Sequence, residues 1–362
     1  VPVAAAPLHR GAGVMFAVAA LAAVAVFVLA ALREPHGSAD ALSIWNLRAR
    51  HLFGAGAVWR DAVANSPHAD YPLLLPCTIA RLWRYAGAAG QVAPAAVALL
   101  FPLTTVALLV AVLRSLRGPL AGLLAGAALL ACPAFVATAP MQYADLVLAF
   151  FVLGTLAVLA VHDHHGRPGV RLAVLAGACL GFAVWTKNEG ALFAIVLLLA
   201  RAVAVRSHGW RCTRRELGAL LLGAAPGIAA WWSVKLLVAP PNDLVAQVAA
   251  GKAADRIADP ARWLEIARAF ATELWNLGPA MLAVVLVWAC LHRQRRLRLP
   301  LAVAALVLAG DALVYLMASH NLSWHLATSL QRLLLQVLPA VLLGVFAATR
   351  AAAPRTTTSS SP

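Results

Sequence analysis

Short polar segments beside long apolar runs carry the residues that could do chemistry. Asp40 follows the first apolar run, and His68, Asp70 and Tyr71 lie together further along the same polar stretch. A carboxylate can take the proton of an attacking hydroxyl group. Ionisable residues near a membrane are costly and usually have a function. Position alone still allows two structural interpretations, a helix cap at Asp40 and a solvated turn at His68-Ala69-Asp70-Tyr71-Pro72.

Two further segments place charges in very short connectors between apolar runs. Gln142-Tyr143-Ala144-Asp145 puts a carboxylate at the start of one run, where it can act in catalysis or cap a helix. Trp185-Thr186-Lys187-Asn188-Glu189-Gly190 places Lys187 and Glu189 in what a plain turn would fill with Gly and Asn. Lys187 can hold a phosphate as a point charge. The alternative for this segment is a mutually neutralised ion pair.

The last apolar run has a polar stripe at one end. His325, Ser329, Arg332 and Gln336 fall within about 60° of one another at 100° per residue. This stripe can bind substrate or line a water-filled cavity. Asp311 is a lone acid inside another apolar run, where it could pair with an Arg of the bundle in a structural role or have a function of its own.

The composition indicates an all-α integral membrane protein. The chain has 362 residues, of which 62% are apolar and 12% are charged, whereas soluble domains are about half apolar and a quarter charged. We predict one bundle over residues 1–349 and a disordered cytoplasmic tail over 350–362. About ten spans are expected, at 13–32, 92–113, 119–138, 144–161, 171–186, 190–205, 217–238, 276–291, 299–318 and 333–349.

The distribution of charge predicts the orientation of this bundle. Short connectors at 201–216 and 291–298 are dense in Arg, which favours a cytoplasmic position for them and for both termini. The two long loops, 33–91 and 239–275, hold most of the acidic residues and would face outward from the plasma (inner) membrane. The net charge of +15 is therefore interpreted as a topology signal and as contacts to lipid headgroups, not as a nucleic-acid site.

Both outer loops are expected to contain amphipathic juxtamembrane helices. Residues 41–53 have an apolar face that would lie at the membrane interface, with Trp45 at headgroup level. Asp259-Pro260 predicts the start of a second such helix, with an apolar stripe that begins at Trp263. Residues 71–85 are expected to form a partly embedded helix that does not cross the membrane.

These segments resemble the GT-C superfamily of membrane glycosyltransferases. The resemblance is to the branch of dolichyl-phosphate-mannose–protein mannosyltransferases and lipid A aminoarabinose transferases. It is carried, in the same order along nearly the whole chain, by Asp40-Ala41-Leu42-Ser43-Ile44-Trp45-Asn46, Tyr71-Pro72-Leu73-Leu74, Tyr143-Ala144-Asp145, Trp185-Thr186-Lys187-Asn188-Glu189-Gly190 and Trp324-His325-Leu326-Ala327-Thr328-Ser329-Leu330-Gln331-Arg332.

The resemblance implies transfer of a sugar from a polyprenyl-phosphate donor to an acceptor hydroxyl at the outer face. An inverting transfer needs one carboxylate as base, which the resemblance places at Asp40, with Asp145 as the second acidic catalytic position. Basic residues would hold the donor phosphate. The substrate-binding candidates are Arg48, His68, Asp70, Tyr71, Lys187, Glu189, His325 and Arg332.

Cofactor and acceptor are less closely defined by the resemblance. A divalent ion such as Mg²⁺ or Mn²⁺ would have to share Asp40 or Asp145 with substrate, because no segment has dedicated ligand spacing. Ala41 follows Asp40 where protein-mannosylating relatives have paired acids, and no sizeable soluble domain follows the spans. The single acid at Asp40 favours an envelope glycan or lipid over a protein as the acceptor, whereas the expected lack of a soluble domain leaves the acceptor's identity open.

Two other functions compete with this hypothesis. A transporter or flippase of a lipid-linked saccharide would carry its charges near the bilayer midplane, whereas here they gather at one interface and only Asp311 departs from that pattern. A non-catalytic envelope-assembly subunit would not require the carboxylates of the first loop.

Overall fold

The computed structural model describes residues 5–166, 169–238, 253–291, 299–318 and 321–348, and within these ranges it contains helices and no strand. The bundle helices are α1 (Ala5–Arg33), α5 (Val92–Arg117), α6 (Pro119–Leu130), α7 (Pro133–Thr138), α8 (Asp145–His164), α9 (Val170–Thr186), α10 (Asn188–Val205), α11 (Trp210–Leu237), α15 (Pro279–Leu291), α16 (Leu299–Met317) and α17 (Leu322–Ala347). The predicted tail over 350–362 and residues 239–252 of the second outer loop lie outside the described residues.

The number of membrane-spanning helices agrees with a polytopic protein. Seven of the described helices are long and apolar enough to cross a bilayer, or nine if each of two bent helix pairs is one span. The pair α6–α7 bends by 65°, and the pair formed by α14 (Pro260–Asn276) and α15 bends by 90°. The predicted span at 276–291 corresponds to α15, which has 13 residues and follows α14 after this bend. The predicted span at 171–186 corresponds to α9, an apolar helix of 17 residues.

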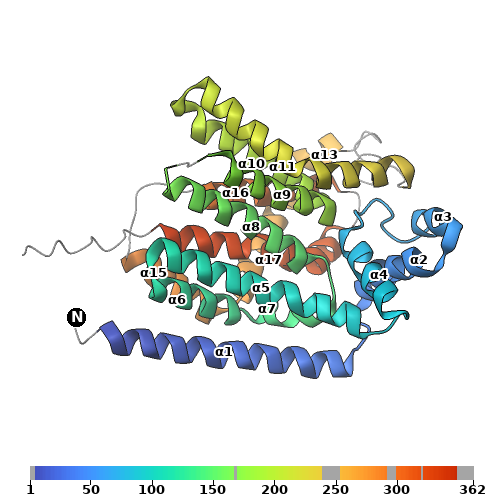
Figure 1. Ribbon diagram of the computed structural model, residues 1–362, viewed down its shortest axis with the longest axis horizontal. Coiled ribbons are helices and arrows are strands. Elements are labelled where there is room, and N and C mark those ends of the chain that lie inside the picture. Colours follow the sequence, from blue (N-terminus) through green and yellow to red (C-terminus); the bar gives the residue numbers. More distant parts are fainter. Residues whose placement is uncertain (1–4, 167–168, 239–252, 292–298, 319–320, 349–362) are drawn as a thin grey trace, which may run out of the picture.

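The helices run back and forth along the long axis of the molecule, so that their ends gather at two opposite faces (Figure 1). We call the end that holds α2 (Asn46–Gly54), α3 (Trp59–Ala64) and α4 (Leu74–Ala86) the site end. It lies on the right in Figure 1, far from the N-terminus. The helices α5, α8, α10 and α17 begin there. Their first turns can therefore carry side chains into one shared region.

Glycines allow the central helices to approach closely. A Cβ atom added at Gly177 of α9 would lie 2.1 Å from the carbonyl oxygen of Leu220, and one at Gly181 would lie 2.5 Å from that of Ala224, both in α11. The four-residue spacing of Gly177 and Gly181 therefore marks a helix–helix contact, as the same spacing of small residues does in many membrane proteins. This contact fixes α9, and with it Lys187, against α11.

The first outer loop folds onto the bundle rather than onto lipid. A π-helical turn (Ala41–Trp45) leads into α2, and a 3-10 turn (Gly56–Val58) connects α2 to α3. Trp45 is 0% exposed and stacks on Tyr71 at 5.7 Å between ring centroids. The prediction that Trp45 lies at headgroup level is therefore wrong, because α4 and Tyr71 cover the apolar face that was assigned to the membrane.

The second outer loop keeps its predicted amphipathic helix. The Asp259 carboxylate accepts a hydrogen bond from the Ala261 N–H at 2.9 Å, and α14 begins at Pro260. Trp263, Leu264, Leu274 and Trp275 remain 44–65% exposed on this helix. Such an apolar surface is expected of a helix that rests against lipid.

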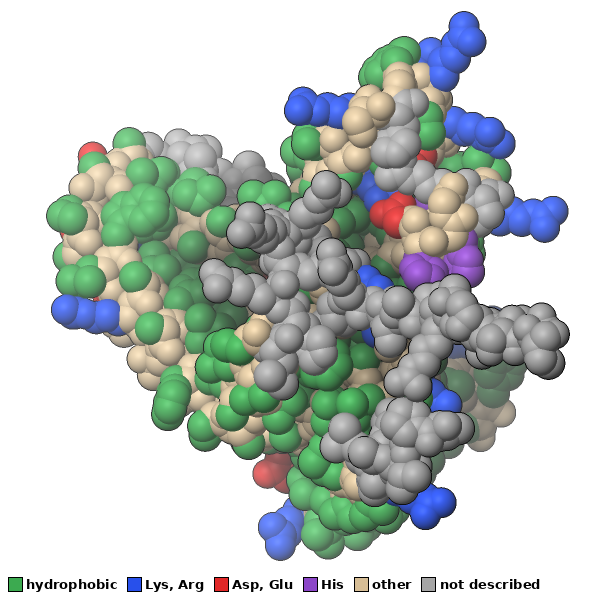
Figure 2. All heavy atoms as spheres, turned by 90° about the vertical axis from the view of Figure 1, so that its left-hand side faces the viewer, with side chains coloured by type: hydrophobic (Ala, Val, Ile, Leu, Met, Phe, Trp, Pro, Cys, Tyr) green, Lys and Arg blue, Asp and Glu red, His purple; other side chains and the backbone are tan. Residues whose placement is uncertain are grey.

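The opposite end of the bundle has an ion-pair cluster of its own around the buried Arg201. The Arg201 guanidinium, 1% exposed, donates to both Asp163 oxygens at 2.6 Å and to Glu216 Oε1 at 2.5 Å. Figure 2 views this end and shows Lys and Arg side chains projecting around its rim. Arg117 also donates to the Ala347 carbonyl here at 2.8 Å. This end is thus Arg-rich, with Arg201 fully paired inside it.

Candidate active site

Asp145 is the centre of a buried charge network at the site end. It is the first residue of α8 and is 0% exposed. Its Oδ1 accepts from Lys187 Nζ at 3.0 Å and from Gln336 Nε2 at 2.7 Å. Its Oδ2 accepts from Arg332 Nε at 3.0 Å and lies 2.9 Å from Nη2. A carboxylate removed from water needs such partners. Here Lys187 comes from the end of α9, and Arg332 and Gln336 both come from α17.

A break between two helices delivers Lys187. Its backbone is extended, with φ −151° and ψ 161°, and it separates α9 from α10. Gly190 makes the close return possible, since a Cβ atom there would lie 1.9 Å from the Ala183 carbonyl oxygen. Lys187 Nζ lies 2.7 Å from Glu189 Oε1. Burial would lower the pKa of Lys187, but the Asp145 and Glu189 carboxylates outweigh it and raise the pKa above its ordinary value.

Arg332 connects the buried carboxylate to the accessible one. Its Nη1 donates to Asp40 Oδ2 at 2.6 Å while the rest of the guanidinium holds Asp145. The Asp40 side chain is 31% exposed and that of Arg332 is 20% exposed. The Tyr143 ring lies 4.6 Å from the guanidinium carbon, and the Tyr143 hydroxyl accepts from the Asp40 N–H at 3.4 Å. Asp40 is therefore a fixed carboxylate with solvent access.

Asp70 joins the first loop to the helices around Lys187. Its Oδ2 accepts from Asn188 Nδ2 at 2.7 Å. Lys235, near the end of α11, donates to the Asp70 carbonyl and to Asn188 Oδ1 at 3.2 Å, and its Nζ lies 3.9 Å from Asp70 Oδ2. Sequence reasoning missed Lys235. Its position in the last turn of an apolar helix was a weak signal, because Lys and Arg are also common at helix ends for topology.

Aromatic rings form one wall beside this network. Tyr71 stacks on Trp45 and, at 5.0 Å, on His68, while Lys187 Nζ lies 5.8 Å from the Tyr71 ring centroid. Burial, together with the nearby Glu189 carboxylate, raises the pKa of Tyr71 to about 12. Tyr71 therefore stays neutral at physiological pH. His68 adopts a left-handed backbone with φ 52°, which is uncommon for a residue other than Gly.

Arg48 does not join the charge network. Its guanidinium is 0% exposed and donates to Ser66 Oγ at 3.0 Å and to the carbonyls of Tyr71, at 3.1 Å, Pro67, at 2.7 Å, and His68. Burial lowers the pKa of Arg48 to about 10, so it remains protonated. This geometry holds the loop that carries Tyr71 and leaves Arg48 no surface for a substrate.

The predicted polar stripe of α17 divides between two places. Arg332 and Gln336 reach Asp145, as described above. Ser329 Oγ instead lies 2.6 Å from the Tyr315 hydroxyl of α16, and the His325 ring lies edge-on to Tyr315 at 4.8 Å. Asp311 is 4% exposed in α16, and no ion pair joins it to an Arg within the described ranges. Its predicted Arg partner is therefore wrong for this part of the chain.

The carboxylates do not fit a metal site. Asp40 and Asp145 lie on either side of one guanidinium, so the cation between them is Arg332. In the part of the chain that the structure describes, no group of three or more His, Cys, Asp or Glu side chains is placed to hold a metal ion. A Mg²⁺ or Mn²⁺ requirement stays a prediction.

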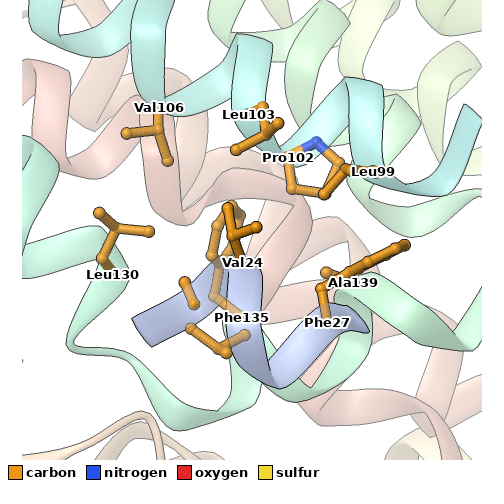
Figure 3. Close-up of a pocket in the computed structure, with 11 residues that line it drawn as sticks. Val24, Phe27, Leu99, Pro102, Leu103, Val106, Leu130, Phe135 and Ala139 are labelled. Atoms are coloured by element: carbon orange, nitrogen blue, oxygen red, sulfur yellow. The ribbon is translucent and has the colours of Figure 1, made fainter. Parts of the chain in front are cut away.

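A small cavity lies between α1, α5 and the bent α6–α7 pair (Figure 3). Apolar side chains line it, among them Val24, Phe27, Pro102 and Phe135. Its volume is about 30 Å³, which is close to the volume that one water molecule occupies in liquid water. With no polar partner for water and no room for a substrate, it is a packing gap next to the bend.

Comparison with known proteins supports the fold and part of the sequence resemblance. Residues 70–233 match the family model described as dolichyl-phosphate-mannose-protein mannosyltransferase. That stretch contains Asp70, Tyr71, Asp145, Lys187 and Glu189. No curated protein matches the chain.

Two solved structures share the fold. The crystal structure of ArnT from Cupriavidus metallidurans bound to undecaprenyl phosphate has a TM-score of 0.59 and 15% identity, and covers 92% of this chain and 59% of that one. ArnT in the apo state has a TM-score of 0.54 and 19% identity, with 91% and 60% covered. The present chain thus spans about 60% of the ArnT chains. The predicted GT-C-like fold and the resemblance to GT-C glycosyltransferases are confirmed.

Proposed function

We propose that this protein transfers a sugar from a polyprenyl-phosphate donor to a hydroxyl group of an acceptor, with inversion at the anomeric carbon. One observation carries the proposal. Arg332 holds an accessible carboxylate, Asp40, and a buried one, Asp145, on opposite sides of one partly exposed guanidinium. A base thus lies directly beside a fixed positive charge, as a transfer from a phosphate leaving group requires.

In the proposed step, Asp40 accepts the proton of the acceptor hydroxyl as its oxygen attacks the anomeric carbon. The bond from that carbon to the phosphate oxygen breaks, and polyprenyl phosphate leaves with the bonding electron pair. Arg332, with 20% of its side chain exposed, contacts the phosphate. A single base suffices for inversion, whereas most glycoside hydrolases need two carboxylates.

Asp145 has a different role in this proposal from that of Asp40. Lys187 and Gln336 hold it from the interior and Arg332 covers it, so Asp145 has no exposed surface from which to reach substrate. We assign it the positioning of Arg332 and Lys187 rather than proton transfer. Lys187, 3% exposed, contributes its charge from behind Arg332. His68, Asp70, Tyr71, Glu189 and His325 remain candidates for contacts to the sugar or acceptor.

The charge distribution supports a site at the outer face of the inner membrane. Arg206, Arg211, Arg214 and Arg215 lie at or near the helix ends opposite the site end. Short Arg-rich connectors remain in the cytoplasm. The site end, with α2–α4 and the amphipathic α14, would then face outward, and both chain termini would be cytoplasmic.

The donor class follows from the site and from the relatives. One ArnT structure contains undecaprenyl phosphate, and the family model names dolichyl-phosphate-mannose. An envelope glycan or lipid is the proposed acceptor class, with a protein acceptor as the alternative. Transport or flipping of a lipid-linked saccharide is the competing function, which the buried Asp311 in the middle of α16 favours.

A turnover measurement tests the transfer reaction. The purified protein in lipid nanodiscs is given a panel of polyprenyl-phosphate sugars and candidate acceptors, and free polyprenyl phosphate is quantified by mass spectrometry. We expect one donor to release polyprenyl phosphate together with a glycosylated acceptor. Donor binding without release, combined with movement of intact donor between leaflets of proteoliposomes, would establish the transporter instead.

Donor affinity tests the assignment of Arg332. Arg332→Gln removes a charge-assisted contact that contributes about 1.5–3 kcal/mol. We therefore expect the Kd for the competent donor to rise by about ten- to a hundredfold in a binding measurement without acceptor. Arg81→Gln is the control, because Arg81 is an exposed cation of α4 at the same end of the bundle. Equal donor affinity in the two variants would refute a phosphate contact by Arg332.

A further inference from the structure

A cavity of about 200 Å³ with both polar and apolar lining lies at the site end, outside the charge network. One wall is the face of the first loop that carries Leu42, Asn46 and Arg50 at four-residue spacing. The others come from His36, from Gln91 at the start of α5, and from Trp83 of α4. It is several times larger than the apolar gap near α1 and holds far more than one water. A group of about one sugar ring is of suitable size.

Asn46 lies in the wall of this cavity, with its side-chain oxygen buried beneath the cavity surface. Asn46 is 7% exposed, and its Oδ1 has no hydrogen-bond partner within the described ranges. Its Nδ2 is already committed to Gln142 Oε1 at 2.7 Å and to the His36 carbonyl at 3.2 Å. These contacts fix the amide, so Oδ1 can only accept.

The remaining lining suits a carbohydrate. Gln91 Nε2 lies 3.0 Å from His36 Nε2, which gives the mouth a side-chain amide and an imidazole. The Arg50 guanidinium lies 5.7 Å from the Trp83 ring centroid. Arg50 gives the cavity wall a positive charge, and none of the residues that line the cavity is Asp or Glu. Amides and an imidazole match neutral hydroxyl groups. Arg50 adds a preference for a phosphate or carboxylate substituent.

The cavity is coupled to the catalytic loop through one dipeptide. Gln142, 2% exposed and left-handed with φ 62°, forms its floor and also donates to the Pro35 carbonyl at 3.1 Å. The next residue, Tyr143, packs on Arg332 and accepts from the Asp40 N–H. A ligand in the cavity would therefore lie next to the turn that carries Asp40.

We infer that this cavity binds a saccharide unit of the acceptor, with the Gln91 amide and the His36 imidazole facing sugar hydroxyls and Arg50 favouring an anionic substituent. The inference rests on the proposed function, because it names the acceptor class for the same site.

Ligand-observed NMR tests this inference without turnover. The probes are methyl glycosides of mannose, glucose, galactose and arabinose, with 6-phosphates of the three hexosides, added to the protein in nanodiscs without donor. Leu42 is 55% exposed and lines the cavity, so Leu42→Trp fills the space without removing a hydrogen bond. Val58→Trp, at a residue that is 61% exposed on the same loop, is the matched control.

We expect at least one wild-type probe to receive saturation transfer, with the signal about tenfold weaker in Leu42→Trp and unchanged in Val58→Trp. Melting temperatures of both variants check that they are folded. The inference would be overturned if no probe gave a signal, or if Leu42→Trp and Val58→Trp gave equal signals. Donor release would remain a separate test of the proposed function. Probe binding without donor release would instead retain the cavity and refute the transferase.

Discussion

Asp40→Asn is expected to lower the turnover number of sugar transfer by about 10²–10⁴-fold, the contribution of a general base. Asn keeps the shape of the side chain and an oxygen that can accept from Arg332, but it cannot take a proton from the acceptor. Asp40 is the more accessible of the two carboxylates that Arg332 holds, with 31% of its side chain exposed against 0% for Asp145. Donor affinity should change less than turnover. The measurement is the rate of polyprenyl phosphate release under saturating donor and acceptor.

Asp259→Asn is the matched control for this variant. It removes another carboxylate at the site end, and Asn is as good a helix cap as Asp. We expect wild-type turnover from the control and an unchanged melting temperature in both variants. Near-normal turnover of Asp40→Asn would remove Asp40 as the base, whichever residue then replaced it.

The sequence predicted which charged residues gather at the site end because its signals were local. Two charges in a three-residue stretch, Lys187 and Glu189, stood out against apolar flanks, and at 2.7 Å they form the ion pair that was the alternative to a phosphate site there. The helical spacing of Arg332 and Gln336 placed both on one face, and both reach Asp145. Burying a charge is costly, so charged residues between spans indicate places where oppositely charged or hydrogen-bonding side chains lie close to them.

What the sequence did not predict depends on contacts between distant segments. Lys235 resembled any cation at the end of a span, and only the fold brings it to Asp70 and Asn188. Arg201 was one of many residues that suggested cytoplasmic topology, yet it pairs with Asp163 and Glu216. The amphipathic pattern around Trp45 was correct, but periodicity does not say whether lipid or α4 covers an apolar face.

Asp145→Asn is expected to destabilise the protein more than any other change at this site. The carboxylate is 0% exposed and neutralises both Lys187 and Arg332. Removing its charge leaves the buried Lys187 and the partly exposed Arg332 with only Glu189 and Asp40, respectively, as charged partners. Breaking a buried pair by removing one member costs about 3–5 kcal/mol. The melting temperature in detergent, followed by tryptophan fluorescence, should fall sharply, and turnover should be lost because Arg332 is no longer held.

A second substitution separates lost charge from lost shape. In the Asp145→Asn/Lys187→Met double variant, the cation that shares Asp145 Oδ1 with Gln336 is also removed, so one uncompensated charge disappears. We expect the double variant to melt at a higher temperature than Asp145→Asn alone, although it should remain inactive. The interaction term of this cycle then measures the coupling between Asp145 and Lys187. If the two losses of stability simply add, Asp145 and Lys187 are not coupled, and the assignment of Asp145 as the residue that positions Lys187 is refuted.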